Sequence, residues 1–223
     1  MPDPTPQRQY ARYRIQLPFL HRVKGPASGK VGGGWSRNLS EGGACLELAE
    51  PLTPSTPLDL LLQTDQGPIR MEADVVWSGE RAAVGGGVLH GVAFTRVAPN
   101  QRQALRNLLV SKGQVRHAGI RLPLDLAVTC RPKGHTGPPL LGRTADMSRG
   151  GLSLRLPEPL PPGQELEIIL HSPSGPLTAE GAVVWVEPSE RRRSRGLIRH
   201  GFQFTVFGWT TSLSLGLLLV EPL

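Results

Sequence analysis

Residues 38–43 read Asn-Leu-Ser-Glu-Gly-Gly, and residues 146–151 repeat the pattern as Asp-Met-Ser-Arg-Gly-Gly. Two further landmarks recur at nearly the same spacing of about 110 residues, namely Val-Val-Trp at 75–77 and 183–185 and His-Gly-x-x-Phe at 90–94 and 200–204. A nearly constant spacing over three landmarks indicates that the chain is two copies of one module. A period this long is typical of tandem domains rather than of a solenoid.

The repeat divides the 223 residues into two domains, for which we predict the bounds 1–112 and 113–223. Each copy is long enough to bury its own core. No apolar run approaches the ~20 residues of a membrane span, and residues 1–6 lack the apolar core of a signal peptide. We therefore expect a cytoplasmic protein, in which Cys45 and Cys130 are buried free thiols.

The balance of charge is basic, with 25 lysines and arginines against 18 aspartates and glutamates and a formal net charge of +7. Most of the cations are arginine, whose planar donor fork suits phosphates and guanine edges. The charge is spread over both copies without a basic tail, which argues against strong non-specific nucleic-acid binding. The densest run is residues 191–195. We expect a solvated loop tip there, with contact to an anionic partner as the alternative.

Alternating apolar residues between Gly- and Pro-rich turns predict a mainly β chain with about six short strands in each copy. The expected strands are 13–19, 35–39, 44–48, 58–63, 69–77 and 88–94 in the first copy, and 122–131, 141–146, 151–156, 164–171, 176–187 and 198–206 in the second. A helix should follow each set, over 99–113 and, with a more apolar sequence, over 210–220. We predict two tandem six-stranded antiparallel β-barrels, each followed by a short C-terminal helix.

The sequence holds no signature of an enzyme. There is no Gly-x-Ser-x-Gly elbow and no phosphate-binding loop that ends in Gly-Lys-Ser or Gly-Lys-Thr, and the six histidines lack the spacing of metal ligands. His90 and His200 recur, and we expect structural roles for both. Trp77 and Trp185 should be aromatic residues of the core or of the barrel rim. We predict neither an enzyme nor a metal site.

Two short motifs carry the functional signal. Arg8 and Arg12 lie four residues apart before the first strand, and Asn38, Ser40 and Gly43 follow at the end of a later strand. An Arg-x-x-x-Arg pair followed by [Asp/Asn]-x-Ser-x-x-Gly resembles the PilZ domain family. The order of strands, the Gly-x-x-Phe pattern and the terminal helix also resemble that family, over essentially the whole chain and once per copy.

The resemblance implies a six-stranded barrel that binds cyclic di-GMP, a bacterial second messenger. It implies that Arg8 and Arg12, on an arm of residues 7–14, contact phosphate and guanine, since an arginine fork can bridge phosphate oxygens or donate to guanine O6 and N7. The platform on the barrel surface would be formed by Asn38, Ser40 and Gly43. Without a ligand, the same residues would be an exposed tail and a local side-chain turn.

The second copy matches the platform but not the arginine pair. Its platform residues are Asp146, Ser148 and Gly151. Arg121 aligns with Arg12, whereas His117 takes the position of Arg8 and Arg116 lies one residue away. A neutral imidazole cannot replace a bidentate guanidinium, so Arg116 would have to reach the ligand instead.

The ligand arm of the second copy, residues 113–121, is also the linker between the domains. Ligand binding there would draw the linker onto the barrel and change the angle between the domains. The alternative is a degenerate copy that is kept for dimerisation or for contact with a partner.

We therefore predict a cytoplasmic bacterial receptor for cyclic di-GMP with no further cofactor. It would change its contact with an unidentified protein of the motility, pilus, exopolysaccharide or gene-regulation machinery. A homodimer is compatible with this function. Two alternatives stay open, a ligand-independent protein-interaction module and a DNA-binding regulator that uses residues 191–195. Salt-dependent binding of DNA would identify the regulator.

Overall fold

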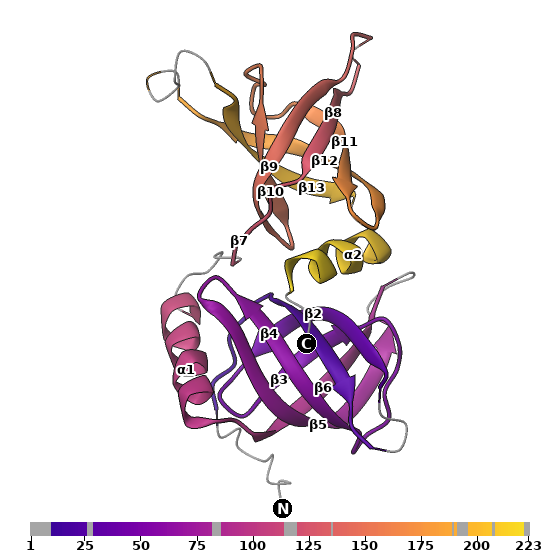
Figure 1. Cartoon of the computed structure of the whole chain (residues 1–223), viewed down its shortest axis with the longest axis vertical. Coiled ribbons are helices and arrows are strands. Elements are labelled where there is room, and N and C mark those ends of the chain that lie inside the picture. Colours follow the sequence, from indigo (N-terminus) through magenta and orange to yellow (C-terminus); the bar gives the residue numbers. More distant parts are fainter. Residues whose placement is uncertain are drawn as a thin grey trace, which may run out of the picture. The chain divides into compact units, whose positions relative to one another are not determined.

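The computed structural model describes residues 10–25, 29–81, 86–113, 120–134, 136–188, 190, 196–206 and 208–220. The chain forms two compact units, Met1–Ile120 with Val220–Leu223, and Arg121–Leu219. Each unit is a β-barrel that carries one helix (Figure 1).

The first unit is a closed barrel of six antiparallel strands in the order β1-β2-β3-β6-β5-β4. Its strands are β1 (Pro18–Val23), β2 (Val31–Leu39), β3 (Gly43–Leu48), β4 (Pro57–Thr64), β5 (Gly67–Arg81) and β6 (Val88–Arg96). Helix α1 (Pro99–Gly113) follows and packs against β5, burying Leu105, Leu108 and Leu109. These are apolar positions at the helical spacing that the sequence predicts.

The second unit repeats the barrel. Its strands are β7 (Leu122–Pro123), β8 (Ala127–Pro132), β9 (Leu140–Ser148), β10 (Gly151–Leu156), β11 (Glu165–Ser172), β12 (Gly175–Val186) and β13 (Ile198–Val206). The ring β10-β13-β12-β11-β8-β9 closes where β9 pairs with β10, and the two-residue β7 also pairs with β9. Helix α2 (Trp209–Leu219) packs against β12. The prediction of two six-stranded barrels, each followed by a helix, is confirmed.

Apolar side chains from alternate strand positions fill both barrels. Fully buried residues include Phe19, Trp35 and Leu62 in the first barrel and Leu154 and Ile168 in the second. Each such side chain contributes roughly 1.5–3 kcal/mol through its removal from water. A closed barrel also leaves no unpaired strand edge.

Both cysteines are free and buried, as expected. Burial raises the pKa of the Cys130 thiol to about 12, because a thiolate has no favourable surroundings inside the barrel. Cys130 is therefore an inert side chain of the core rather than a nucleophile.

The segment before the first strand of each barrel differs from our prediction. The alternation predicts a strand over 13–19, but β1 begins only at Pro18. A buried hydroxyl interrupts the strand ladder in this segment, because the Leu17 N–H donates to Ser36 Oγ (2.9 Å) and Ser36 Oγ donates to the Ile15 carbonyl (2.7 Å). The alternation of apolar residues did not reveal the later start of β1, because Ile15 and Leu17 are both buried as they would be in a strand.

In the second barrel a side-chain hydroxyl also bonds to the backbone before the first long strand. The strand expected over 122–131 is split into β7 and β8. Thr144 stands where the first copy has Ser36, accepts from the Leu126 N–H (2.9 Å) and donates to the Leu124 carbonyl. The recurrence shows that the hydroxyl is part of the module.

The recurring histidines also have structural roles, as expected. Nε2 of His90 accepts from the Leu52 N–H (2.9 Å) while Nδ1 lies 3.1 Å from the Val88 carbonyl, and His200 makes the equivalent contacts with Leu160 and Ile198. A ring that accepts at one nitrogen and donates at the other is neutral. Burial accordingly lowers the pKa of His90.

His21 is a buried histidine, and we expect it to make folding sensitive to pH. Its ring is buried against Gly32, and its Nδ1 has no hydrogen-bond partner among the described residues. Burial lowers the pKa of His21 from 6.5 to about 4, with smaller lowering effects from His90 and Lys30 and an opposing effect from Glu50. Between these two pH values the unfolded chain binds a proton that the folded chain does not.

We predict that the unfolding free energy of the full chain is unaffected by His21 above pH 6.5 and falls as the pH drops from 6.5 towards 4. The loss attributable to this ring is up to about 3 kcal/mol. Urea unfolding at a series of pH values would measure it. The His21→Leu variant should show a flatter profile than the wild type. Equal slopes for wild type and His21→Leu would contradict the assignment.

Candidate functional site

A groove on the first barrel gathers residues from the N-terminal arm, the turn after β2, and strands β5 and β6. Its volume is about 360 Å³, and its lining is Tyr10, Arg12, Ser40, Gly42, Gly43, Val76, Trp77, Gly91, Val92 and Ala93. The structure thus brings together three residues that the motifs singled out, Arg12, Ser40 and Gly43. Arg8 lies outside the described residues.

The serine and the glycine of the motif close a tight turn between β2 and β3. The Ser40 N–H and Oγ both donate to the Gly43 carbonyl, at 2.9 Å and 3.0 Å. A Cβ on Gly43 would overlap the carbonyl oxygen of Val92 on β6. Both residues therefore shape the barrel wall as well as the groove.

The second copy builds the same turn. Ser148 Oγ donates to the Gly151 carbonyl (3.3 Å), and a Cβ on Gly151 would overlap the carbonyl oxygen of Phe202. The recurrence of Ser-x-x-Gly therefore has a structural cause that is independent of any ligand. A difference in ligand binding between the two copies would therefore have to come from the arginines and from the position of Asn38 and Asp146.

Asn38 lies on β2 opposite Cys45 on β3. Its side-chain oxygen is buried and has no hydrogen-bond partner among the described residues. An unpaired buried acceptor costs about 1–3 kcal/mol, so this oxygen is suited to accept from a ligand donor. Burial raises the pKa of Cys45, while the charges of Arg12 and Arg37 oppose that rise. Cys45 thus lies opposite Asn38 and within electrostatic range of Arg12.

Two aromatic rings flank this groove, and the sequence motifs did not reveal either as a site residue. The ring of Tyr10 lies where a Cβ on Gly42 would be, and the indole of Trp77 lies across Gly91. Tyr10 is 43% exposed and Trp77 is 40% exposed. Trp77 is thus on the outer wall rather than in the core.

A sequence signal for the tryptophan did exist. Trp185 lies across Gly201 in the second barrel as Trp77 lies across Gly91 in the first. The recurrence of a tryptophan with a distant glycine marked a packed pair, but only the strand register shows that the indole lies outside the barrel.

The predicted residues of the second copy form a closed network. Asp146 accepts from Arg121 Nε, from Ser153 Oγ (3.0 Å) and from Arg199 Nη2 (3.5 Å). Ser153 occupies the position of Cys45 in the first copy. Where the first copy leaves a neutral acceptor unpaired among the described residues, the second has a carboxylate with three donors. Arg116 and His117 lie outside the described residues.

In both copies, the residue after the motif serine contacts the terminal helix of its own unit. Glu41 accepts from Arg106 Nε of α1 (2.8 Å). Arg149 lies over the Trp209 ring of α2, 5.9 Å from its centroid. An ion pair in one copy and a cation–π contact in the other thus link the turn to the helix.

Neither a metal site nor a membrane span emerges from the residues that the structure describes. No group of three or more His, Cys, Asp or Glu is placed there to hold a metal ion. No helix in the same residues has the length and apolar character needed to cross a membrane.

Comparison with known proteins places these observations in a family. The model of the PilZ domain matches the chain twice, over residues 6–111 and 114–208. No curated protein matches the chain.

The chain is also similar to solved structures. One is the PilZ domain of YcgR from Escherichia coli with c-di-GMP, with 20% identity, coverage of 48% of this chain and 91% of that chain, and a TM-score of 0.41. The inhibitor of motility MotI/DgrA from Bacillus subtilis has 10% identity, with coverage of 90% of this chain and 94% of that chain and a TM-score of 0.37. The complex of MrkH from K. pneumonia with c-di-GMP has 16% identity, with coverage of 92% of this chain and 86% of that chain and a TM-score of 0.38.

We predict that Gly43→Ala and Gly151→Ala each destabilise their barrel by about 1–3 kcal/mol, because the added methyl group meets a backbone carbonyl that cannot move without breaking strand pairing. Thermal unfolding would measure the loss. Gly150→Ala is the control, since a Cβ there meets open space. If Gly43→Ala left stability unchanged, the glycine would not be a constraint of the barrel.

Proposed function

The chain belongs to the PilZ family, and on that premise we propose that it is a bacterial receptor and effector for cyclic di-GMP. PilZ domains are receptor or adaptor domains rather than enzymes. We propose that the two domains span 1–112 and 113–223, with ligand arms at 7–14 and 113–121.

The observation that carries the proposal is a groove lined by the cation Arg12 and the exposed rings of Tyr10 and Trp77. The unpaired buried oxygen of Asn38 lies on the adjoining strand β2. Cyclic di-GMP has two phosphates and two guanines. The Arg12 guanidinium can bind a phosphate or the O6 and N7 edge of a guanine, with Arg8 adding a second fork from the arm. The side-chain oxygen of Asn38 can accept from a guanine N–H.

The aromatic rings supply what arginine and asparagine cannot. Tyr10 and Trp77 offer flat faces on which a guanine can stack, and stacking of this kind contributes about 1–3 kcal/mol per base. Ser40 and Gly43 hold the turn that forms the floor between them. We assign all of these residues to one ligand site.

The second copy is proposed as a weaker or accessory site. Asp146 already holds Arg121, and a ligand phosphate would have to compete with that carboxylate for the arginine. Ser148 and Gly151 remain in place to form the floor of the site. The closed network equally suits a ligand-independent interaction module, which is the second candidate for this copy.

The turn of the first site is connected to helix α1 by an ion pair. Ligand contact at the turn of residues 40–43 acts next to Glu41, whose carboxylate holds Arg106. A change at the turn therefore alters an anchor of α1. We propose that the helix or the adjoining wall then changes its contact with a cytoplasmic protein partner. Motility, pilus, exopolysaccharide and gene regulation are the processes in range, and homodimerisation or DNA binding through residues 191–195 are alternative outputs.

We predict that Arg12→Ala weakens binding of cyclic di-GMP by at least about 1.5 kcal/mol, which is more than tenfold, because a charge-assisted hydrogen bond is lost. Calorimetric titration of the full chain would measure this. Stability should not change, since Arg12 is exposed. Exposed Arg14, which does not line the groove, provides the matched control as Arg14→Ala.

Two further results would redirect the proposal. Arg121→Ala should leave the tight binding phase intact, and loss of that phase would make the second copy the principal site. Absence of binding by the wild-type chain would favour the interaction module.

We also predict that Trp77→Ala lowers the affinity for cyclic di-GMP by about 1–3 kcal/mol through lost stacking. Trp185→Ala is the matched control, because that indole packs on its glycine in the same way in the second barrel. Quenching of tryptophan fluorescence on titration provides an independent measurement. Equal losses in the two variants would point to a general effect on folding instead.

A further inference from the structure

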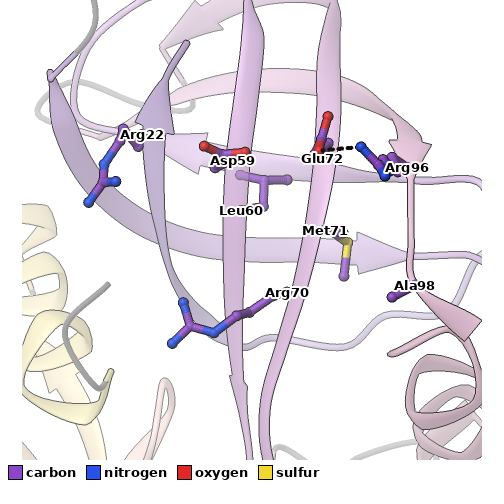
Figure 2. Close-up of a pocket in the computed structure, with 8 residues that line it drawn as sticks. All are labelled: Arg22, Asp59, Leu60, Arg70, Met71, Glu72, Arg96 and Ala98. Carbon is purple, nitrogen blue, oxygen red and sulfur yellow. Dashed lines mark ion pairs between the residues drawn. The ribbon is translucent and has the colours of Figure 1, made fainter. Parts of the chain in front are cut away.

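A second groove of about 360 Å³ lies on the outer wall of the first barrel, across β1, β4, β5 and the end of β6. Five of its lining residues are charged, Arg22, Arg70 and Arg96 with Asp59 and Glu72 (Figure 2). It shares no lining residue with the groove assigned to cyclic di-GMP. A binding function of this second groove is therefore independent of that assignment.

The second barrel has the equivalent groove, of about 350 Å³. The strand registers establish the equivalence. The pair Asp59–Glu72 of the first barrel corresponds to the pair Glu167–Glu180 of the second. In the same way Leu61–Arg70 corresponds to Ile169–Thr178, and Glu72–Arg96 corresponds to Glu180–Val206. The module thus forms this hollow in both copies, and only the side chains differ.

The ion pairs at the carboxylates recur as well. In the first barrel Lys24 lies 2.9 Å from Glu72 and 3.6 Å from Asp59. In the second barrel Lys133 lies 2.8 Å from Glu180 and 3.5 Å from Glu165. The pair of the lysine with Glu72 or Glu180 is therefore a shared feature of the barrel wall, whereas the second carboxylate differs because Glu165 aligns with Pro57 rather than with Asp59.

Two of the arginines have no counterpart. Thr178 stands where the first barrel has Arg70, and Val206 stands where it has Arg96. The second barrel closes and forms its groove without them. The barrel architecture therefore does not require Arg70 and Arg96, and their presence on one copy points to a function.

The arginines of the first groove are available to a partner. Arg22 and Arg70 are exposed and make no ion pair among the described residues. Figure 2 shows both side chains extending away from Glu72, which is paired with Arg96 (3.8 Å). Since the two carboxylates are held by Lys24 and Arg96, the unused binding capacity of the groove is cationic.

We propose that this groove is a docking site for an acidic, extended segment of a partner protein. Arg22 on β1 lies opposite Asp59 on β4, and Arg70 on β5 lies opposite Leu61, two residues further along β4. The Cα atoms of the two arginines are therefore about 10 Å apart across the strands and about 7 Å apart along them. Carboxylates about four residues apart in an extended segment span that separation. Each could form a bidentate pair with one guanidinium.

The carboxylates in the groove favour a polypeptide over a nucleic acid. The evenly charged backbone of a nucleic acid would be repelled by Asp59 and Glu72. A peptide can place neutral residues beside these carboxylates and acidic residues beside Arg22 and Arg70. The groove therefore selects spaced rather than continuous negative charge.

The test is a titration of the ¹⁵N-labelled full chain with the peptide acetyl-Ala-Glu-Ala-Val-Ala-Glu-Ala-amide, followed through the arginine Nε–H resonances. The same peptide with Gln in place of both Glu is the control ligand. We expect saturable shifts at Arg22 and Arg70 with the acidic peptide alone. The Arg22→Gln, Arg70→Gln double variant should weaken binding about tenfold, as expected for two exposed charge pairs.

A complementary variant transfers the site to the second barrel. Thr178→Arg with Val206→Arg replaces two exposed side chains, and it should add a second binding event in that groove. Thermal unfolding of every variant controls for folding. Shifts that are not saturable at Arg22 and Arg70, or an unchanged affinity in the double variant, would overturn the proposal. Tighter binding of oligothymidylate than of the acidic peptide at these arginines would also overturn it, in favour of a nucleic-acid site.

Discussion

Close approach of neighbouring strands at the motif turn is the constraint on which both barrels depend. Gly43 and Gly151 lie so near the carbonyls of the adjacent strand that no side chain fits there. The serine of each motif caps the same turn by donating to the glycine carbonyl. Once this turn is in place, the arm, the aromatic ring and the next strand converge on it. The groove lined by Ser40 and Gly43 is thus a by-product of closing the barrel, which is why the motif recurs in both copies.

The two copies then diverge at the position of Asn38 and Asp146 and at two of its neighbours, where Ser153 and Arg199 replace Cys45 and Leu89. Asn38 is neutral and leaves its oxygen unpaired among the described residues, whereas Asp146 attracts Arg121 and Arg199. A carboxylate that holds its own arginine lowers the gain from a ligand phosphate, because the new contact replaces an existing one. The same fold can therefore support an open site in one copy and a closed network in the other.

A similar division applies to the outer wall. Lys24 and Lys133 make equivalent ion pairs with carboxylates, and the hollow beside them is nearly the same size in both barrels. Arg70 and Arg96 occur on the first copy alone. Duplication of a module supplies an internal comparison that separates residues common to both barrels from residues particular to one copy. By that comparison, the first barrel carries the more specialised surfaces.

The repeat, the barrel class, the terminal helices and the buried cysteines were all predictable from residue patterns, because periodicity and spacing report which side chains face inward. Arg12, Ser40 and Gly43 were also found as neighbours through their motifs. Patterns could not show that Ser36 and Thr144 interrupt a strand ladder, that the indole of Trp77 lies on the outer wall, or that Asp146 is already paired. Nor could they show the outer groove, whose arginines lie on three separate strands. These features depend on strand register and on contacts between residues distant in the chain, which arise only when the barrel closes.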